Sequence, residues 1–430
     1  KYSLAFYPKW LKSILAFTNG EFETVTREEA WIAKTEENKA NRFTDKSGRF
    51  RHNDFAEWLI EEYHIRGING IVHTYRNGEY VPGNSAIEVA IQKEAPTLKR
   101  AAKAEVLDYI RVNAMSNTVD YSAPNLILFK NGVLDLNSGE LLEHSPDYVI
   151  PNMIPWNYNP LAKSEMLDKF LNDISCSDTQ IRALIEEMAG YCMYRSARLK
   201  TAFILTGMKD NGKSTLIDLL KAMLGRHNYA TLDLKDLGDR FRTSGLFGKL
   251  ANVSAEISET YKENMETFKS VVSGDGITIE FKGKDAIEDY VSFVTCIFAA
   301  NEKPRLKDPT GAVMRRLKII PLNAQFTDER GNVDYGMREN LKKPEHVEAF
   351  IVLAVEGLKR ALSNGFTRSA TGEAEKAEYE RENNPILAFI DEMGGIEAFE
   401  NEPTQTMYEK YLGFCARNNF KEVSGLTLFL

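Results

Sequence analysis

Short apolar runs alternate with segments of helical spacing through the middle of this chain. Residues 201–205 are continuously apolar, which is typical of a buried strand, and residues 214–224 have helical spacing that stops at Gly225. Further strand patterns lie at 250–255, 277–282, 292–300 and 317–322. Helical patterns lie at 164–174, 178–195, 259–272 and 344–364, and residues 232–247 are interpreted as a turn and a helix. Strands that alternate with helices in this way predict an α/β domain with a parallel, doubly wound sheet.

The residues before this domain carry two hairpin signals. Asn-Gly pairs at 77–78 and 131–132 each separate two strand patterns, and Asp54 is placed to cap a helix over 55–63. Other segments have helical spacing, so we expect a mostly helical N-terminal domain. The predicted divisions of the chain are an extension or linker at 1–50, the N-terminal domain at 51–161, the α/β domain at 162–343 and a C-terminal part at 344–430.

The C-terminal part combines a charged run with two short helical patterns. Residues 372–384 are rich in charge and are interpreted as a solvated connector. Helical patterns follow at 385–393 and 404–418, and then a short apolar end. This order predicts a small winged-helix-like domain that is cut short at Leu430.

Composition narrows the class of protein without deciding its function. A chain of 430 residues is long enough for two to four domains, and it begins with Lys1, so we expect a fragment. The four cysteines are scattered, which argues against a zinc ribbon and fits a reducing cytoplasm. No apolar run is long enough for a membrane span. The net charge of −8 does not favour nucleic-acid binding, which would depend on local basic groups.

The chemistry centres on a phosphate-binding loop between the strand at 201–205 and the helix at 214–224. Its sequence fits G-x-x-x-x-G-K-[ST], and a strand, a glycine loop and a helix are the setting that this motif requires. The loop N–H groups and the helix dipole would hold the phosphates of ATP, while Lys213 adds a positive charge and Ser214 a hydroxyl ligand for Mg²⁺. The predicted nucleotide-binding residues are Gly207, Met208, Lys209, Asp210, Asn211, Gly212, Lys213, Ser214 and Thr215.

Polar residues at the ends of the following strands complete a candidate hydrolytic site. Glu256 follows one buried strand and is the candidate to hold Mg²⁺ through water and to polarise the attacking water. Asn301 follows the next and would orient that water. Arg315 and Arg316 open a further strand, where neighbouring side chains point opposite ways, so one of them could reach a neighbouring subunit's ATP as an arginine finger.

A loop tip with two lysines is the candidate contact with DNA. Lys282 and Lys284 flank Gly283 after an alternating strand, and exposed lysines on a loop suit phosphate oxygens.

These motifs together resemble superfamily III DNA helicases, and most closely the poxvirus-type and phage/plasmid primase-helicase family. The matching stretches are GMKDNGKST for motif A, GKLANVSAEI for motif B, FKSVVSGDGITIEFKGKDA for the motif between B and C, and FAANEKPRLKDPTGAVMRRLKIIPL for motif C. Upstream, LFKNGVLDLNSGELLEHSPD is similar to the helicase-associated N-terminal domain of that family.

The resemblance implies an AAA+-like ATPase that assembles into a ring, usually a hexamer, with ATP between subunits and a DNA-gripping loop in the channel. By match, Lys213 and Ser214 are Walker A residues, Glu256 is Walker B, Asn301 is sensor 1, and Arg315 or Arg316 is the finger. Many relatives have two acids in motif B, whereas Ala255 precedes Glu256 here, so one acid would serve both metal and water, or Ser254 would assist. We find no primase carboxylates and expect the helicase part alone, with a primase domain or other replication proteins as partners.

The leading hypothesis is an ATP-dependent replicative DNA helicase of a phage or mobile element, acting on single-stranded and forked DNA in the cytoplasm of a bacterial host. Two alternatives stay open. One is an AAA+ loader or remodelling NTPase that does not unwind DNA, and the other is an origin-binding initiator in which ATP acts as a switch.

Overall fold

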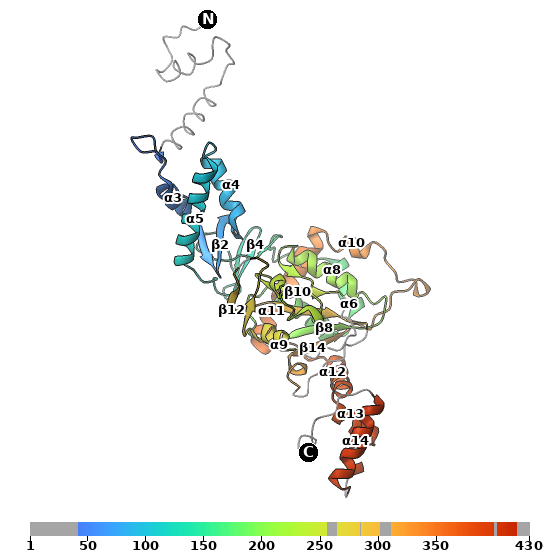
Figure 1. The fold of residues 1–430 in the computed structure, drawn as a ribbon. Helices are drawn as coiled ribbons and strands as arrows, with labels where there is room; N and C mark the ends of the chain where they lie inside the picture. Colours follow the sequence, from blue (N-terminus) through green and yellow to red (C-terminus); the bar gives the residue numbers. More distant parts are fainter. Residues whose placement is uncertain (1–41, 256–264, 284, 302–310, 400–401, 419–430) are drawn as a thin grey trace. The chain divides into compact units, whose positions relative to one another are not determined.

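The structure is a computed structural model that describes residues 42–255, 265–283, 285–301, 311–399 and 402–418 (Figure 1). The chain divides into two compact units, one ending at Asp120 and the other beginning at Tyr121. Each unit has its own hydrophobic core. The domain predicted at 51–161 therefore contains this division.

The first unit packs three helices against a small antiparallel sheet. Its elements are α3 (His52–Glu62), β1 (Arg66–Ile68), β2 (Ile71–Arg76), β3 (Glu79–Pro82), α4 (Asn84–Glu94) and α5 (Arg100–Ser116). β2 and β3 form the predicted hairpin, because Asn77 and Gly78 both adopt positive φ, of 51° and 91°. The predicted cap is wrong: α3 begins before Asp54, whose carboxylate lies in the first turn and pairs with Arg51 at 2.5 Å.

A four-stranded sheet opens the second unit and shares the core of the helices that follow it. Its strands pair in the order β6 (Leu141–Leu142), β5 (Gly132–Asp135), β4 (Leu126–Phe129) and β7 (Met153–Ile154). β4 and β5 are the second predicted hairpin, which is confirmed. Ile127, Phe129 and Leu134 are buried together with side chains of the next two helices, α6 (Glu165–Ile174) and α7 (Thr179–Tyr191).

The centre of the second unit is a five-stranded parallel sheet. Its strand order is β14 (Leu317–Pro321), β8 (Ala202–Thr206), β13 (Thr295–Ala299), β10 (Ala251–Ser254) and β9 (Tyr229–Ala230). Every neighbouring pair is parallel, which confirms the parallel sheet predicted from the apolar runs. β8 thus lies between two strands that come much later in the chain, and the carboxyl ends of all five strands meet at one edge.

Alternate side chains of these strands enter two different hydrophobic layers. Phe203 and Leu205 of β8 face α6, α7, α8 (Lys213–Leu224) and α11 (Pro344–Asn364), whereas Ala202 and Ile204 face the opposite layer. The helix ends agree with the sequence: Ser164 and Asp178 cap α6 and α7, and Gly225 ends α8 with φ of 78°.

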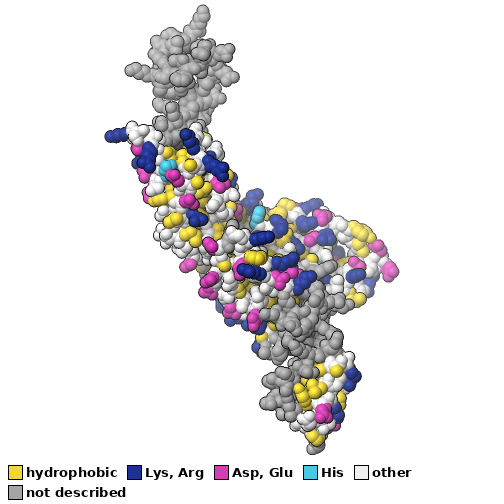
Figure 2. All heavy atoms as spheres, viewed as in Figure 1, with side chains coloured by type: hydrophobic (Ala, Val, Ile, Leu, Met, Phe, Trp, Pro, Cys, Tyr) yellow, Lys and Arg dark blue, Asp and Glu magenta, His cyan; other side chains and the backbone are white. Residues whose placement is uncertain are grey.

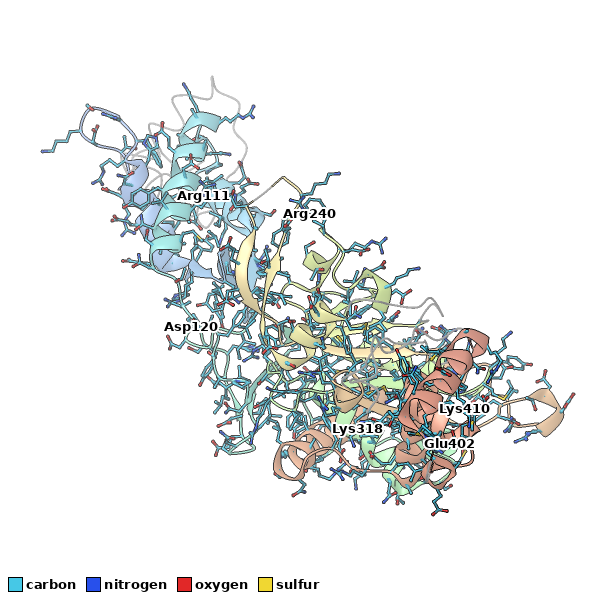
Figure 3. The ribbon with its side chains drawn as sticks, turned by 60° about the horizontal axis from the view of Figure 1, so that its bottom comes forward. Arg111, Asp120, Arg240, Lys318, Glu402 and Lys410 are labelled. Carbon is cyan, nitrogen blue, oxygen red and sulfur yellow. The ribbon has the colours of Figure 1, made fainter. Side chains whose placement is uncertain are left out.

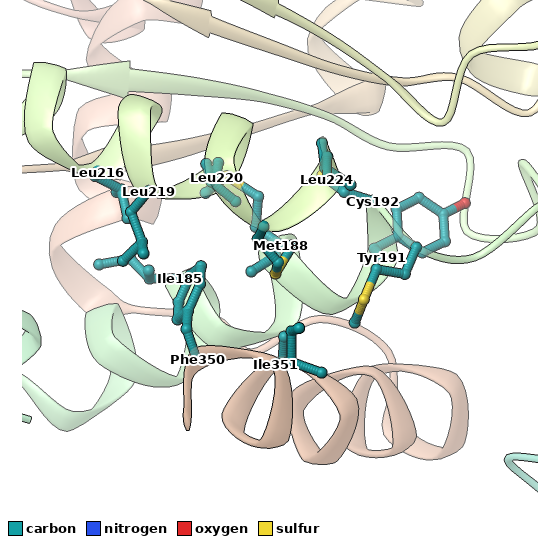
Figure 4. Close-up of a cluster of buried hydrophobic side chains, with 14 of the residues drawn as sticks. Ile185, Met188, Tyr191, Cys192, Leu216, Leu219, Leu220, Leu224, Phe350 and Ile351 are labelled. Carbon is teal, nitrogen blue, oxygen red and sulfur yellow. The ribbon is translucent and has the colours of Figure 1, made fainter. Parts of the chain in front are cut away.

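The helical layer is closely packed around α7, α8 and α11. Figure 4 shows Leu216, Leu219, Leu220 and Leu224 of α8 meeting Ile185 and Met188 of α7, with Phe350 and Ile351 of α11 beneath them. Gly190 of α7 makes the approach to α11 possible, since a Cβ atom there would lie 2.0 Å from the Ala354 carbonyl oxygen and 2.8 Å from Leu358 Cβ.

We expect Gly190→Ala to destabilise the second unit by about 2–3 kcal/mol, because the added methyl group would push the backbones of α7 and α11 apart. Gly413→Ala is the matched control: it also lies in a helix, where its Cβ position meets only a flexible Arg417 nitrogen at 3.6 Å. That change should be neutral or stabilise by up to about 1 kcal/mol. Thermal unfolding followed by circular dichroism measures both, and equal melting temperatures would contradict the close-approach argument.

The opposite layer includes a helix, a hairpin and short 3₁₀ turns. The hairpin is β11 (Gly276–Ile279) with β12 (Ile287–Val291), and the helix is α9 (Glu266–Ser273). The helix predicted within 232–247 is wrong, since the chain there forms η2 (Leu234–Asp236) and η3 (Thr243–Leu246). Gly238, with φ of 100°, interrupts the segment between them. The first part of the helix predicted at 259–272 lies outside the described residues.

The charged run near the C-terminus is a helix rather than a connector. α12 (Ala370–Asn383) packs on β14 and buries Tyr379 to 1 % exposure. Lys318 of β14, labelled in Figure 3, pairs with Glu373 at 3.1 Å, and Lys376 Nζ donates to the Leu317 carbonyl oxygen at 2.9 Å. The sequence prediction was wrong because these charged groups are satisfied against a sheet edge.

Two further helices end the described chain. α13 (Pro385–Glu392) and α14 (Thr404–Asn418) confirm the predicted helical patterns, with the 3₁₀ turn η6 (Ile396–Phe399) between them. Phe389, Tyr411, Phe414 and Cys415 form their small core. The wing predicted after residue 418 lies outside the described residues, so the winged-helix-like domain stays a prediction.

Candidate nucleotide-binding site

The predicted phosphate-binding loop connects the carboxyl end of β8 to the first turn of α8. Gly207 has φ of 135°, and a Cβ atom there would lie 2.3 Å from the Leu322 carbonyl oxygen. Gly212 has φ of 85°, and its Cβ position lies 2.7 Å from Ile174 Cγ2. Both the backbone conformation and the space therefore require glycine at these two positions.

The Lys213 ammonium lies over the loop and is held by three acceptors. Its Nζ donates to the carbonyl oxygens of Gly207 at 2.5 Å and Met208 at 2.9 Å, and to Asn211 Oδ1 at 3.2 Å. The residue is 7 % exposed, and burial lowers the pKa of its amine. An ammonium at this place brings positive charge to the mouth of the loop with little competition from water.

Asn211, one of the predicted nucleotide-binding residues, also has a structural role in the loop that the motif does not indicate. Its buried side chain donates from Nδ2 to the Leu322 carbonyl oxygen at 2.8 Å and accepts at Oδ1 from the Lys213 N–H at 3.2 Å. Phe326 N–H donates to the Asp210 carbonyl oxygen at 2.7 Å. Two neighbouring loop residues, Asp210 and Asn211, are thus hydrogen-bonded to the segment that follows β14.

A cavity of about 870 Å³ opens beside the loop, within the size range of small-molecule sites. Ser214 and Asn301 are exposed and line it, so the structure brings these two predicted residues to one place. Glu256 lies outside the described residues, but its neighbour Ala255 lines the cavity. The lining residues are Lys169, Phe170, Asp173, Met208, Lys209, Asp210, Asn211, Gly212, Lys213, Ser214, Thr215, Ala255, Asn301, Phe326, Asn332, Val333, Asp334, Met337 and Arg338.

The two candidate finger residues lie apart from this cavity and differ from each other. They are not on a strand, as predicted, but in the 3₁₀ turn η4 (Met314–Arg316) that leads into β14. Arg316 Nε donates to Ser273 Oγ at 2.8 Å and its Nη1 to the Ala312 carbonyl oxygen at 2.7 Å. Arg315 is exposed. Neither is among the lining residues.

The candidate DNA loop lies at the turn between β11 and β12. Lys282 is exposed there, beside Gly283 with φ of 74°, whereas Lys284 lies outside the described residues. Glu280, just before the turn, forms an ion pair with Arg240, which Figure 3 labels. On the face shown in Figure 2 acidic and basic side chains are interspersed, so a DNA contact would depend on local groups such as this turn.

One wall of the cavity was not predicted from the sequence. It comes from α6 and from the segment after β14, which includes η5 (Asp328–Arg330) and α10 (Met337–Asn340). Phe170, Phe326 and Met337 contribute apolar surface to it. These residues lie in no recognisable motif, and only the fold brings the two segments to the same side of the loop.

Two structural findings limit other kinds of site. Within the described part of the chain, no group of three or more histidine, cysteine, aspartate or glutamate side chains could hold a metal ion. None of the helices seen in this part of the chain is both long and apolar enough to cross a membrane.

Comparison with known proteins agrees with the motifs. A family model described as D5 N terminal like matches residues 25–176, and one described as a family of unknown function (DUF5906) matches 205–316. The chain is 25% identical over 292 residues to "Putative helicase L207/L206" of Acanthamoeba polyphaga mimivirus, covering 62% of this chain and 30% of that protein. It is 26% identical over 242 residues to "Putative helicase 184R" of Invertebrate iridescent virus 6, covering 51% and 24%.

These matches fall on the segments that carry the motifs. The matches agree with the resemblance to the viral and phage primase-helicase family of superfamily III. It spans less than a third of the length of either of these two curated relatives. A solved structure, the A form apo structure of the NrS-1 C terminal region, resembles this chain with a TM-score of 0.50 at 15% identity, over 83% of this chain and 82% of that one. At this identity the likeness concerns the fold alone.

Proposed function

We propose that this chain is the motor part of an ATP-dependent DNA helicase from a phage or mobile element. The observation that carries the proposal is the loop from Gly207 to Ser214, at the carboxyl edge of a parallel sheet and open to a cavity that Asn301 also lines. Ligands bind at this edge in open α/β sheets. The helicase names of the two viral relatives support the choice of DNA as the substrate.

The loop would bind the phosphates through its backbone and Lys213. The positive φ values at Gly207, Asp210 and Gly212 turn the chain tightly, so that N–H groups converge at the amino end of α8. Lys213 would exchange its bonds to the Gly207 and Met208 carbonyl oxygens for bonds to phosphate oxygens. Because its ammonium is already over the loop, little side-chain ordering would accompany this exchange.

Hydrolysis would combine Ser214, Glu256 and Asn301. The exposed Ser214 hydroxyl at the start of α8 fits a ligand of Mg²⁺, which when bound neutralises charge on the phosphates. Glu256, as the next residue after Ala255, would complete the Mg²⁺ shell through water and polarise the attacking water. The Asn301 amide would orient that water, whose oxygen attacks the γ-phosphorus while the bond to the β-phosphate oxygen breaks, giving ADP and phosphate.

The motor would work as an AAA+-like ring, which the resemblance implies to be a hexamer, with each ATP between two subunits. Arg315 is the better candidate for the finger that reaches the neighbouring site, because its side chain is exposed. Lys282 and Lys284, on the turn between β11 and β12, would contact DNA phosphates in the channel.

Strand displacement on forked DNA is the experiment that tests this proposal. We expect the purified chain to separate a forked duplex when ATP and Mg²⁺ are supplied, and single-stranded DNA to stimulate ATP turnover. An AAA+ loader or remodelling NTPase would turn over ATP without separating strands. An origin-binding initiator would bind a particular duplex sequence tightly and show negligible stimulation by DNA.

A further inference from the structure

The cavity beside the loop has an apolar wall that the phosphates would not need. Phe326 and Phe170 stand next to the last glycine of the loop: a Cβ atom on Gly212 would lie 3.3 Å from Phe326 Cε2 and 3.6 Å from Phe170 Cε2. Phe170 is 3 % exposed, whereas Phe326 is half-buried and presents part of its ring to the cavity. Met337 and Val333 extend the same surface.

The segment that carries Phe326 is fixed in place by hydrogen bonds. The Phe326 N–H donates to the loop at the Asp210 carbonyl oxygen, at 2.7 Å. Asn332 donates to the Gln325 carbonyl oxygen at 2.8 Å and accepts from the Thr327 N–H at 3.0 Å. Arg338 pairs with Asp218 of α8 at 2.6 Å. The wall is therefore formed before any ligand binds, which lowers the entropy cost of binding.

Several polar side chains around this wall already have partners within the protein. Besides Asn332, Asp334 accepts from the Gly336 N–H at 2.9 Å, and Asp173 pairs with Lys169 at 2.6 Å. What the wall offers to a ligand is thus chiefly aromatic and aliphatic surface. Such a surface suits a flat, weakly polar group.

We propose that Phe326, supported by Phe170 and Met337, holds the nucleoside part of the bound nucleoside triphosphate. This inference rests on the proposed function, since it takes the loop as the phosphate site. With the phosphates at the loop, the base and ribose of the ligand need a binding surface next to it. The apolar wall adjoins the loop and matches the flat faces of a nucleobase.

The test compares two ligands that share the phosphates and differ in the nucleoside. Calorimetric titration with ATP and with inorganic tripolyphosphate, both with Mg²⁺, separates the contributions of base and phosphate. We expect Phe326→Ala to weaken ATP binding about tenfold, the loss of one aromatic contact, and to leave tripolyphosphate binding unchanged. Phe326→Trp keeps a flat ring and should retain most of the affinity for ATP.

The matched control is Tyr335→Ala, which removes an 80 % exposed aromatic ring from the same segment and should change neither affinity. Equal weakening of both ligands by Phe326→Ala would show that the ring only supports the loop, and an unchanged ATP affinity would show that it makes no contact. Either result overturns the inference and leaves the proposed function standing. A wild-type chain that binds neither ligand would overturn the proposed function itself. Melting temperatures verify that each variant is folded.

Discussion

Replacing Lys213 with alanine will reduce ATP turnover by a factor on the order of 10²–10³ and abolish strand displacement. The ammonium is the charged side chain held directly over the loop, through the carbonyl oxygens of Gly207 and Met208. Its positive charge would stabilise the negative charge that develops on the phosphates as the bond to the leaving group breaks. Steady-state phosphate release, with and without single-stranded DNA, measures the loss.

Lys221→Ala is the matched control, because Lys221 lies on the same helix α8 but near its other end, against the ring of Tyr229. We expect this variant to keep turnover close to that of the wild type. Wild-type turnover in the Lys213 variant would contradict the assignment of the loop. A similar loss in both variants would mean that damage to α8, rather than lost phosphate contact, explains the result.

If the chain forms the proposed ring, we expect subunits that carry Arg315→Ala to inactivate the rings into which they mix. If Arg315 acts on a neighbour's ATP, each variant subunit inactivates the ATP site of the neighbouring subunit rather than its own. Arginine fingers contribute about 10³-fold or more to turnover, so a site that lacks its finger hydrolyses almost no ATP. If the subunits of a ring work in sequence, an equal mixture with wild-type subunits should keep far less than half of the wild-type turnover.

Arg316→Ala provides the comparison within the same turn. Its guanidinium bonds to Ser273 and to the Ala312 carbonyl, so we expect its loss to lower the melting temperature of the isolated chain. The mixing experiment is read from turnover against the fraction of variant subunits. If turnover falls in proportion to the fraction of Arg315 variant subunits, the ATP site is not shared between subunits. If only the Arg316 variant causes a steeper fall in turnover, Arg316 is the finger and Arg315 is not.

The loop and the strands around it could be predicted because their signals are local. The glycines at 207 and 212 are required by backbone conformation, and the continuous apolar runs are required by burial on both faces. The two Asn-Gly hairpins were found for the same reason. Each of these patterns depends on residues a few positions apart, which a sequence displays directly.

The remaining parts depend on contacts between distant segments. Asn211 is bonded to Leu322, more than a hundred positions away, and Phe170 and Phe326 come next to Gly212 only in the fold. The charges of α12 suggested a solvated connector because their partners, such as Lys318, lie on a strand elsewhere in the chain. Arg315 and Arg316 were placed on a strand because an apolar run follows them directly, and periodicity could not show the 3₁₀ turn.

The contact between α12 and the end of β8 has a mechanical consequence. Thr206, the residue immediately before Gly207, is 3 % exposed, and its hydroxyl donates to the Glu375 carboxylate at 2.7 Å. Lys376, the next residue of α12, donates to the Leu317 carbonyl oxygen at the start of β14. A displacement of α12 would therefore act directly on the residue that precedes the phosphate-binding loop. The helix α12 is thus bonded directly to the end of β8 and to the start of β14.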